Sequence, residues 1–217
     1  MRELSFAVFF CVAIAVVLAQ QNANVEASQT PPTQTAQPGR STAQSQPSTP
    51  TAAPAQSAAA EKMPQANPTD VRDGDAIVKA VYDVISGPAG QKRDWQRFRS
   101  LFWPGARLIP ALDRPSGAVG AHVLTIDEYI SRSEPFMLKE GFFESEIARH
   151  TDSYGHVVQV FSTYESRHRR EDSKPFARGI NSIQLLCGPE RCWVMNIFWQ
   201  GERPDTPIPD RYLKSDK

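Results

Sequence analysis

Apolar residues recur every three to four positions in the first stretch of the chain that can fold. The segment DGDAIVKAVYDVISGPAG (73–90) shows this spacing, which is typical of one buried face of a helix. Asp73 or Asp75 can cap its start, and the Gly87-Pro88 pair ends it. The next segment, DWQRFRSLFWPG (94–105), predicts a second and shorter helix that stops at its Pro-Gly pair.

A strand, a third helix and four more strands follow. The segment ARLIPALDR (106–114) predicts a strand at a sheet edge or a bulge, because it contains a proline. The segment from Thr125 to Gly141 predicts a helix, which starts at a capping box of Thr125 and Glu128 and is kinked by Pro135. Strands joined by short turns are predicted at 142–150, 156–167, 175–187 and 192–201. This order predicts an α+β fold with three helices packed on one face of a curved, mostly antiparallel sheet.

The first nineteen residues differ from the rest. An apolar run covers 4–19, which suits the core of a signal peptide and is short of the roughly 20 residues that a membrane span needs. Small side chains at Val17 and Ala19 favour cleavage after residue 19, and Val25 and Ala27 offer a second site. We therefore predict a signal peptide at 1–19, an exported protein (periplasmic or secreted), and no stable membrane span after cleavage. An uncleaved N-terminal anchor is the alternative.

The segment 20–70 is predicted to be a disordered linker. It consists mostly of Gln, Ala, Ser, Thr and Pro, and its only charged residues are Glu26, Arg40, Glu61, Lys62 and Asp70. Such a composition cannot bury enough apolar surface to offset the conformational entropy of the chain. The folded domain is therefore expected at 71–217.

Two cysteines flank the last predicted turn. Cys187 and Cys192 bracket Gly-Pro-Glu-Arg, which suits a four-residue hairpin loop. In an oxidising compartment two neighbouring cysteines usually pair, so we predict a disulfide. Free thiols and a redox-active pair are the alternatives.

Charge and histidine placement narrow the function classes. The chain balances 24 Lys and Arg against 24 Asp and Glu, which argues against nucleic acid as a partner. The basic cluster at 167–170 is followed at once by acidic residues, so it is interpreted as a solvated hairpin tip. His150, Asp152 and His156 have the chemistry of zinc ligands, but a turn at Asp152 and Gly155 explains them as well. No metal site and no cofactor are predicted.

The order of elements is similar to that of a known superfamily. The phrases VYDVISGPAG, DWQRFRSLFWPGARLIP, FARGINSIQLL and NIFWQ…PIP resemble an uncharacterised bacterial branch of the nuclear-transport-factor-two-like, or SnoaL-like, superfamily. The resemblance implies a cone-shaped fold with an internal cavity. It implies no single activity, because this fold hosts isomerases, dehydratases, cyclases, epoxide hydrolases and proteins without a known reaction.

Alternation along the strands predicts which side chains face the cavity. We expect Cys187 opposite Cys192, His150 opposite His156, and Tyr164 opposite Arg178. The face toward the helices then carries Phe142, Glu144, Glu146, Ser162, Tyr164, Arg178, Ile180, Ser182, Trp193, Met195, Ile197 and Trp199. The candidate ligand-binding residues among these are Glu144, Glu146, Tyr164, Arg178, Ser182 and Trp199, with Arg178 expected to pair with a glutamate.

The opposite face of the sheet is also apolar in this register. It would carry Phe143, Ile147, Phe161, Asn181, Ile183, Leu185, Val194, Asn196 and Phe198. A patch of this size is expected to be covered by a second copy, so we predict a homodimer through the outer sheet face.

Three functions remain open. The first is an exported domain that binds a small apolar or amphipathic molecule in the cone. The second is an enzyme of the same fold in which a glutamate performs proton-transfer or hydration chemistry. The third is a non-catalytic domain for envelope assembly, and the sequence alone leaves open whether the protein is an enzyme.

Overall fold

The structure, a computed structural model, describes residues 64–113 and 117–215. The predicted signal peptide and most of the predicted linker lie outside these residues. The helices are α2 (Pro68–Val71), α3 (Gly74–Ile85), α4 (Trp95–Ser100), α5 (Ile126–Glu140) and the short 3-10 helix η2 (Asp210–Leu213). The strands are β1 (Phe102–Asp113), β2 (Val119–Ala121), β3 (Phe143–Tyr154), β4 (Val157–Arg167), β5 (Ala177–Cys187) and β6 (Cys192–Gly201). No helix within the described ranges is long and apolar enough to cross a membrane.

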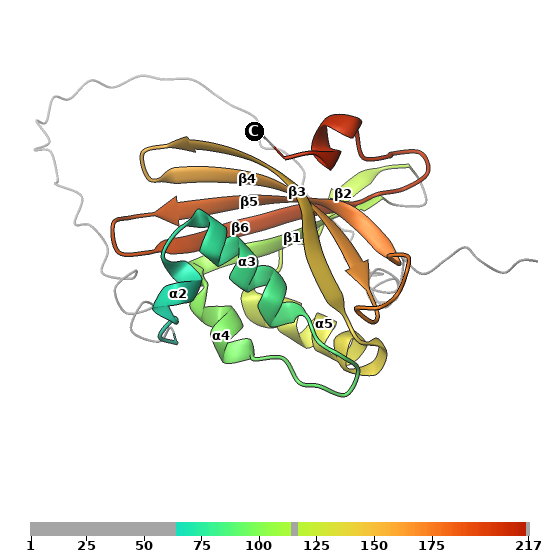
Figure 1. Cartoon of the computed structure of the whole chain (residues 1–217), viewed down its shortest axis with the longest axis horizontal. Coiled ribbons are helices and arrows are strands. Elements are labelled where there is room, and N and C mark those ends of the chain that lie inside the picture. The colour runs from blue at the N-terminus through green and yellow to red at the C-terminus, as the bar shows by residue number, and fades with distance from the viewer. Residues whose placement is uncertain (1–63, 114–116, 216–217) are drawn as a thin grey trace, which may run out of the picture.

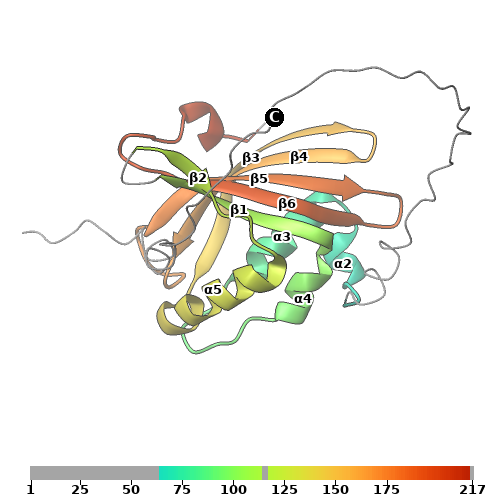
Figure 2. The same ribbon diagram turned by 180° about the vertical axis from the view of Figure 1, so that it is seen from behind.

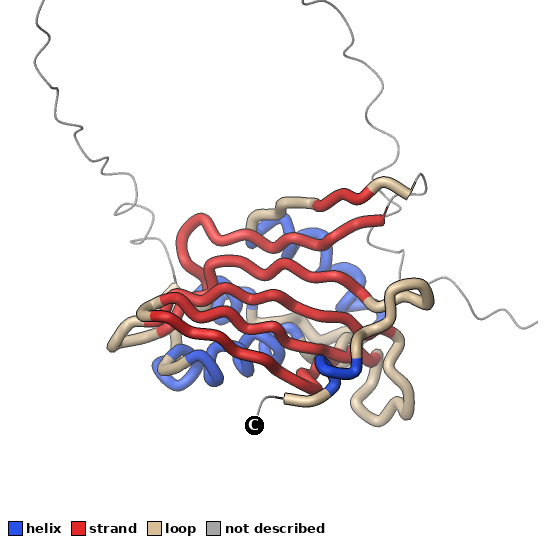
Figure 3. The backbone as a smooth tube through the Cα atoms, turned by 90° about the horizontal axis from the view of Figure 1, so that it is seen from above, coloured by secondary structure: helices blue, strands red, loops and turns tan. Residues whose placement is uncertain are grey.

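The six strands form one curved sheet in the order β2-β1-β6-β5-β4-β3. The strands β3 to β6 are an antiparallel meander, β1 runs parallel to β6, and β2 pairs antiparallel with β1. The helices α3, α4 and α5 cover one face of this sheet (Figure 1), and the view from behind shows the same layers (Figure 2). The C-terminal segment with η2 crosses the other face (Figure 3). The predicted α+β fold class is therefore confirmed.

The helices start where capping chemistry predicts. The Asp73 side chain accepts a hydrogen bond from the backbone N–H of Ala76 (2.7 Å), so α3 begins directly after it. Thr125 and Glu128 form the predicted capping box of α5. The prediction for α4 was too long, because the chain is already in β1 at Phe102 and passes Pro104-Gly105 within that strand.

Arg97 ties three helices together at the start of the domain. Its guanidinium donates to Asp70 of α2 at 2.7 and 3.0 Å, and to Asp83 of α3 at 2.6 Å. These contacts hold α2, most of which was predicted to belong to the linker, against α3 and α4.

The core lies between the helices and the inner sheet face. Phe98 and Phe102 pack with ring centroids 4.7 Å apart, and both are almost fully buried. The sheet contributes Val160, Ile183, Leu185, Val194 and Ile197 to the same cluster. Burial of these side chains supplies the main force that holds the two layers together.

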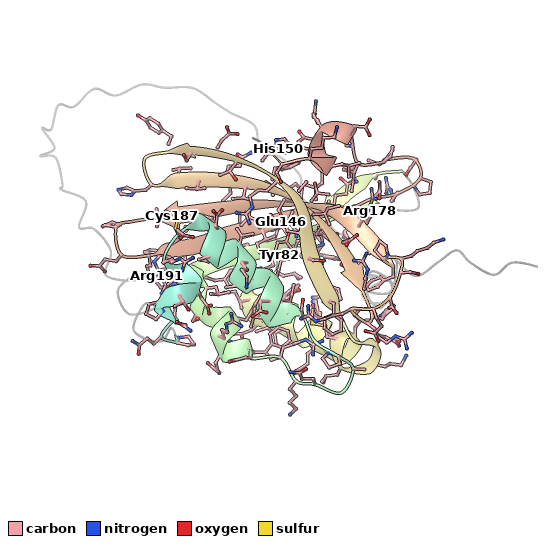
Figure 4. All side chains as sticks on the ribbon, in the orientation of Figure 1. Tyr82, Glu146, His150, Arg178, Cys187 and Arg191 are labelled. Carbon is pink, nitrogen blue, oxygen red and sulfur yellow. A yellow bond between two sulfur atoms is a disulfide. The ribbon has the colours of Figure 1, made fainter. Side chains whose placement is uncertain are left out.

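The disulfide predicted at the last hairpin is present. Cys187 and Cys192 are directly opposite each other in the β5–β6 pair and are bonded. The Arg191 guanidinium lies 3.3 Å from the ring centroid of Trp193 and donates to the backbone carbonyl of Ser100 (2.9 Å). The hairpin end, where Figure 4 labels Cys187 and Arg191, is thereby attached to the C-terminal end of α4.

Two of the three predicted strand registers are wrong. His150 lies opposite Phe161 and not His156, because β3 and β4 extend to a tight turn at 155–156 and β3 has a bulge between Glu146 and Ala148. Tyr164 lies opposite Gly179 and not Arg178. The β5–β6 register holds from Cys187 to Leu185 and then shifts by one residue. A shift of one residue turns a strand's side chains to the other face.

The register shift exchanges the two faces of β5. Asn181, Ile183 and Leu185 are buried toward the helices, whereas Arg178, Ile180 and Ser182 lie on the outer face. On β6, Cys192 and Val194 are buried, whereas Trp193, which was predicted to face the helices, is only partly buried. The predicted division into cavity face and outer face was therefore wrong for β5 and for the first part of β6.

The C-terminal segment covers part of the outer sheet face. The Tyr212 ring packs on Phe161 with centroids 4.8 Å apart, and the Tyr212 carbonyl accepts a hydrogen bond from Thr163 (2.5 Å). Phe198 on the same face remains 45% exposed. The predicted homodimer through this face stays a prediction.

The two histidines considered as zinc ligands have separate structural contacts. The Nε2 atom of His150 lies 2.7 Å from the Arg211 carbonyl, and the Nδ1 atom of His156 lies 2.7 Å from the Cys187 carbonyl. Within residues 64–113 and 117–215, no group of three or more His, Cys, Asp or Glu side chains is placed to hold a metal ion.

Candidate functional site

A cavity of about 250 Å³ lies between α5 and the wide end of the sheet. α5 contributes Tyr129, Arg132, Ser133, Phe136 and Met137 to its walls. The sheet and its connections contribute Pro110, Ala111, Leu112, His122, Leu124, Phe142, Glu144, Tyr164, Ser166, Phe176, Ala177, Trp199 and Gly201. These residues come from every strand except β2, and they lie together only because the sheet curves around α5.

Aromatic rings form most of the cavity wall. Tyr129 and Trp199 meet edge to face with centroids 6.3 Å apart. On the opposite side Phe136 packs against Phe142 at 6.5 Å and against Phe176 at 6.3 Å. Such walls suit the apolar part of a small molecule.

Glu144 is the acidic residue of this cavity. Its carboxylate accepts hydrogen bonds from Ser166 Oγ at 2.9 Å and from Asn181 Nδ2 at 3.5 Å. Part of the Glu144 residue reaches solvent, but its carboxyl group is enclosed by protein atoms. Loss of water raises the pKa of Glu144 to about 7, and the two hydrogen bonds offset only part of that effect. The group therefore gains and loses its proton near neutral pH.

A chain of hydrogen bonds connects Glu144 to α3. Asn181 Nδ2 also donates to the Tyr82 hydroxyl (3.0 Å), which lies 2.7 Å from Ser162 Oγ. Ser162 donates to Glu146 at 2.5 Å, so the Tyr82 hydroxyl is the donor to Ser162 and the acceptor from Asn181. The amide of Asn181 is thereby oriented with its NH₂ group toward Glu144.

Glu146 does not line the cavity, which corrects the prediction. Arg149 binds its carboxylate with two nitrogens at 2.8 and 2.6 Å, and also pairs with Asp75 of α3. The bulge after Glu146 places Arg149 on the same side of β3 as Glu146. Glu146 therefore lies in a polar crevice between α3 and β3, which Asp75 and Arg149 also line. Figure 4 labels Glu146 on β3 and Tyr82 on α3.

The remaining candidate residues divide between the two faces. Tyr164 and Trp199 line the cavity together with Glu144, as predicted. Arg178 pairs instead with Glu202 on the outer side (2.8 Å), and Ser182 lies in an outer groove. Both corrections follow from the one-residue shift of β5. Ligand binding by any of the six residues stays a prediction.

Several residues of the site were missed from the sequence. Ser166 lies two residues after Tyr164 on β4, so strict alternation could have found it. Asn181 was assigned to the wrong face by the register error. Arg132 and His122 lie on α5 and in the β2–α5 connection, and no pattern in the sequence pointed to the cavity from there.

Gly179 provides the space that the Tyr164 ring occupies. A Cβ atom at this position would lie 2.5 Å from the Tyr164 hydroxyl, 2.7 Å from its Cζ atom and 2.4 Å from the Gln200 carbonyl oxygen. Gly179→Ala should therefore lower the free energy of unfolding by about 1–3 kcal/mol or more, as overpacking does. Urea denaturation measures this loss.

A matched control lies directly across the β5–β6 pair. Gly201 is the register partner of Gly179, and an added Cβ there would meet only the Arg178 carbonyl at 3.8 Å. Gly201→Ala should leave stability almost unchanged. Equal losses in the two variants would show that the contact with Tyr164 is not the reason for glycine at 179.

Comparison with known proteins finds similar chains only among solved structures. No protein-family model and no curated protein match the chain. A protein of unknown function with a cystatin-like fold from Nostoc punctiforme is 11% identical, with a TM-score of 0.43 over 61% of this chain and 90% of that chain. An NTF2-like protein of unknown function from Silicibacter pomeroyi is 12% identical, with a TM-score of 0.41 over 59% and 92%. A candidate ketosteroid isomerase from Kribbella flavida is 14% identical, with a TM-score of 0.35 over 66% and 87%.

These likenesses carry no inference about function. Their names describe those proteins, and the fold class of this chain does not depend on them. The assignment to this cone-shaped α+β class rests on the element order, the curved sheet and the helices on its inner face.

Proposed function

We propose that the domain binds a small, predominantly apolar molecule in the cavity between α5 and the sheet. The observation that carries this proposal is an aromatic-lined space with one carboxyl group, Glu144, held in its wall by Ser166 and Asn181. Protein interiors are normally close-packed, and ligand sites are mostly apolar spaces with a few placed polar groups, so this aromatic-lined space with its single carboxyl group favours a ligand site.

The volume limits the size of the ligand. An engineered apolar cavity of roughly 150 Å³ holds benzene. The present cavity of about 250 Å³ therefore suits one substituted ring or a short alkyl chain. The half-exposed Trp199 and the exposed Arg132 lie in its wall, so a ligand can enter from solvent.

One observation favours catalysis as a second candidate. A general base works best when its pKa is close to the working pH, and the pKa of Glu144 is about 7. Under this alternative the same cavity positions a substrate, and Glu144 accepts or returns its proton. Glu144→Gln would then abolish turnover while the neutral ligand still binds.

Export and dimerisation remain part of the proposal. The Cys187–Cys192 disulfide supports export, because disulfides persist mainly in oxidising compartments. The partly exposed Phe198 on the outer sheet face supports association with a second copy. Mass spectrometry of the mature N-terminus and light scattering test the two points; an intact Met1 or a concentration-independent monomer would contradict them.

Filling the cavity should abolish binding. Ala177 lines it from β5, and Ala177→Phe adds a ring there without removing a side-chain hydrogen bond. In isothermal titration with substituted benzenes and short alkyl alcohols, the affinity of this variant should be lower by about tenfold or more. The added ring takes the place of the ligand, and each loss of about 1.4 kcal/mol in binding free energy lowers the affinity tenfold. Ala89→Phe, the same change in an exposed loop, should bind like the wild type. Unchanged binding by Ala177→Phe would place the site elsewhere, and no binding by the wild type would favour the envelope-assembly alternative.

A further inference from the structure

The cavity has charged groups of opposite sign on opposite walls. Arg132 of α5 lines it as the cationic group, and His122 of the β2–α5 connection lines it as a further polar group. The His122 backbone N–H donates to the Pro110 carbonyl of β1 at 3.2 Å, which holds this connection against the sheet. Glu144 lines the same cavity from β3. The cavity therefore has a cationic side and an acidic side.

The sheet topology keeps these two sides apart. β1 and β3 are separated in the sheet by β6, β5 and β4. His122 is tied to β1, so three strands lie between its attachment point and Glu144 of β3. Arg132 lines the cavity from the helix layer, whereas Glu144 lines it from the sheet layer. Glu128, one turn earlier on the same helix, interacts electrostatically with Arg132, and its carboxylate also accepts a hydrogen bond from the backbone N–H of Thr125 (2.8 Å) in the capping box.

The two sides also differ in contact with water. Arg132 is exposed and His122 is partly exposed, whereas the carboxyl group of Glu144 is enclosed. A charged ligand group can meet Arg132 without losing all of its hydration. The same group placed at Glu144 would have to be desolvated, which is costly for any charge.

From this arrangement we propose that the ligand is an amphipathic monocarboxylic acid, bound with its carboxylate at Arg132 and His122 and with its apolar part in the cavity. The inference rests on the proposed function and names the chemical class of its ligand. A guanidinium recognises a carboxylate through two parallel hydrogen bonds, which a neutral head group cannot reproduce.

Other orientations and charges fit less well. An acid inserted head first would place its carboxylate near Glu144, and two like charges in a dry site disfavour each other. An amine with its head at the rim would meet the cationic Arg132. An amine with its head inside would pair with Glu144 only after losing its water.

Three probes with one skeleton test the ligand class by isothermal titration at pH 7.5 and low salt. They are 4-phenylbutyrate, the neutral 4-phenylbutanamide and the cationic 4-phenylbutylamine. The acid should bind at least tenfold more tightly than the amide, and the amine should bind most weakly. The advantage of the acid should shrink in 0.5 M salt, because charges near the surface are screened.

A charge-removing variant tests the position of the head group. Arg132→Gln should weaken binding of the acid at least tenfold and change binding of the amide less than twofold, whereas Arg132→Lys should retain part of the preference. Lys139→Gln is the matched control, since it removes one positive charge from the same helix at a side chain that is 80% exposed and does not line the cavity.

The outcomes distinguish the inference of an acid ligand from the proposal that the cavity binds a small molecule. Equal binding of acid and amide, with no effect of Arg132→Gln, would overturn the acid inference and leave small-molecule binding intact. Tightest binding of the amine would also overturn it and would identify Glu144 as the counter-ion. If neither the amide nor the apolar compounds bind the wild type, the proposed function itself fails.

Discussion

The unfolding free energy of the wild type, relative to that of Glu144→Gln, should fall by about 3 kcal/mol between pH 4 and pH 8. The pKa of Glu144 is raised from 4.5 to about 7 in the folded protein. Below pH 4.5 the group is protonated in both states, so its contribution to stability is fully present. As the pH rises toward 7 the unfolded chain releases this proton while the folded protein keeps it, and the contribution is lost as the pH passes through the folded pKa.

Urea denaturation at pH 4, 6 and 8 measures this difference. Glutamine is close to glutamate in size, and its amide oxygen can accept from Asn181 while its NH₂ group donates to Ser166 Oγ. Glu144→Gln should therefore be more stable than the wild type at pH 8. Glu146→Gln is the contrasting control, because it removes a charged partner of Arg149 and should lower stability at pH 8. Parallel pH profiles for the wild type and Glu144→Gln would show that this carboxyl group is hydrated in the folded protein.

Replacing Arg93 with methionine should cost roughly 3 kcal/mol or more of unfolding free energy, because each buried polar group left without a partner costs roughly 1–3 kcal/mol. Arg93 is only 7% exposed, and its guanidinium donates to the carbonyls of Ile85 (2.8 Å), Gly87 (2.6 Å) and Gln91 (2.5 Å). These carbonyls lie at and just beyond the end of α3, where the helix dipole favours a positive charge. Methionine fills similar space but donates no hydrogen bond.

The Arg93 substitution should also disturb the ligand site. Gly87 exchanges backbone hydrogen bonds with Phe142 at 2.7 and 3.0 Å, and Phe142 lines the cavity two residues before Glu144. In Arg93→Met, the free energy of unfolding and the affinity for the ligand should therefore both fall, as measured by denaturation and by ligand titration. Arg72→Met is the control, since the Arg72 side chain is 68% exposed and pairs with the exposed Asp73 at 3.0 Å. A loss no larger than that of Arg72→Met would mean that water replaces the guanidinium at little cost.

The features that the sequence predicted correctly depend on neighbours in the chain. α3 and α5 follow from apolar spacing together with Asp73, Thr125 and Glu128, because a cap acts on N–H groups two or three residues away. The disulfide follows from two cysteines that flank one short turn. The cavity residues Glu144, Tyr164 and Trp199 were also found, because each lies on a strand where alternation happened to place it on the inner face.

The features that the sequence did not predict depend on contacts between distant segments. The bulge after Glu146 and the shift of β5 by one residue moved Glu146, Arg178 and Ser182 out of the cavity, and alternation cannot reveal either irregularity.

The sequence by itself determined the helices α3 and α5 and the antiparallel meander of β3 to β6, since these follow from local periodicity, capping and short turns. Only the tertiary structure decided which carboxyl group is dry and which cations face it. The pKa of Glu144 depends on Ser166 and Asn181, 22 and 37 residues away, and on the enclosure made by α5. Desolvation is a property of the whole surrounding shell of atoms, so no spacing along the chain can encode it.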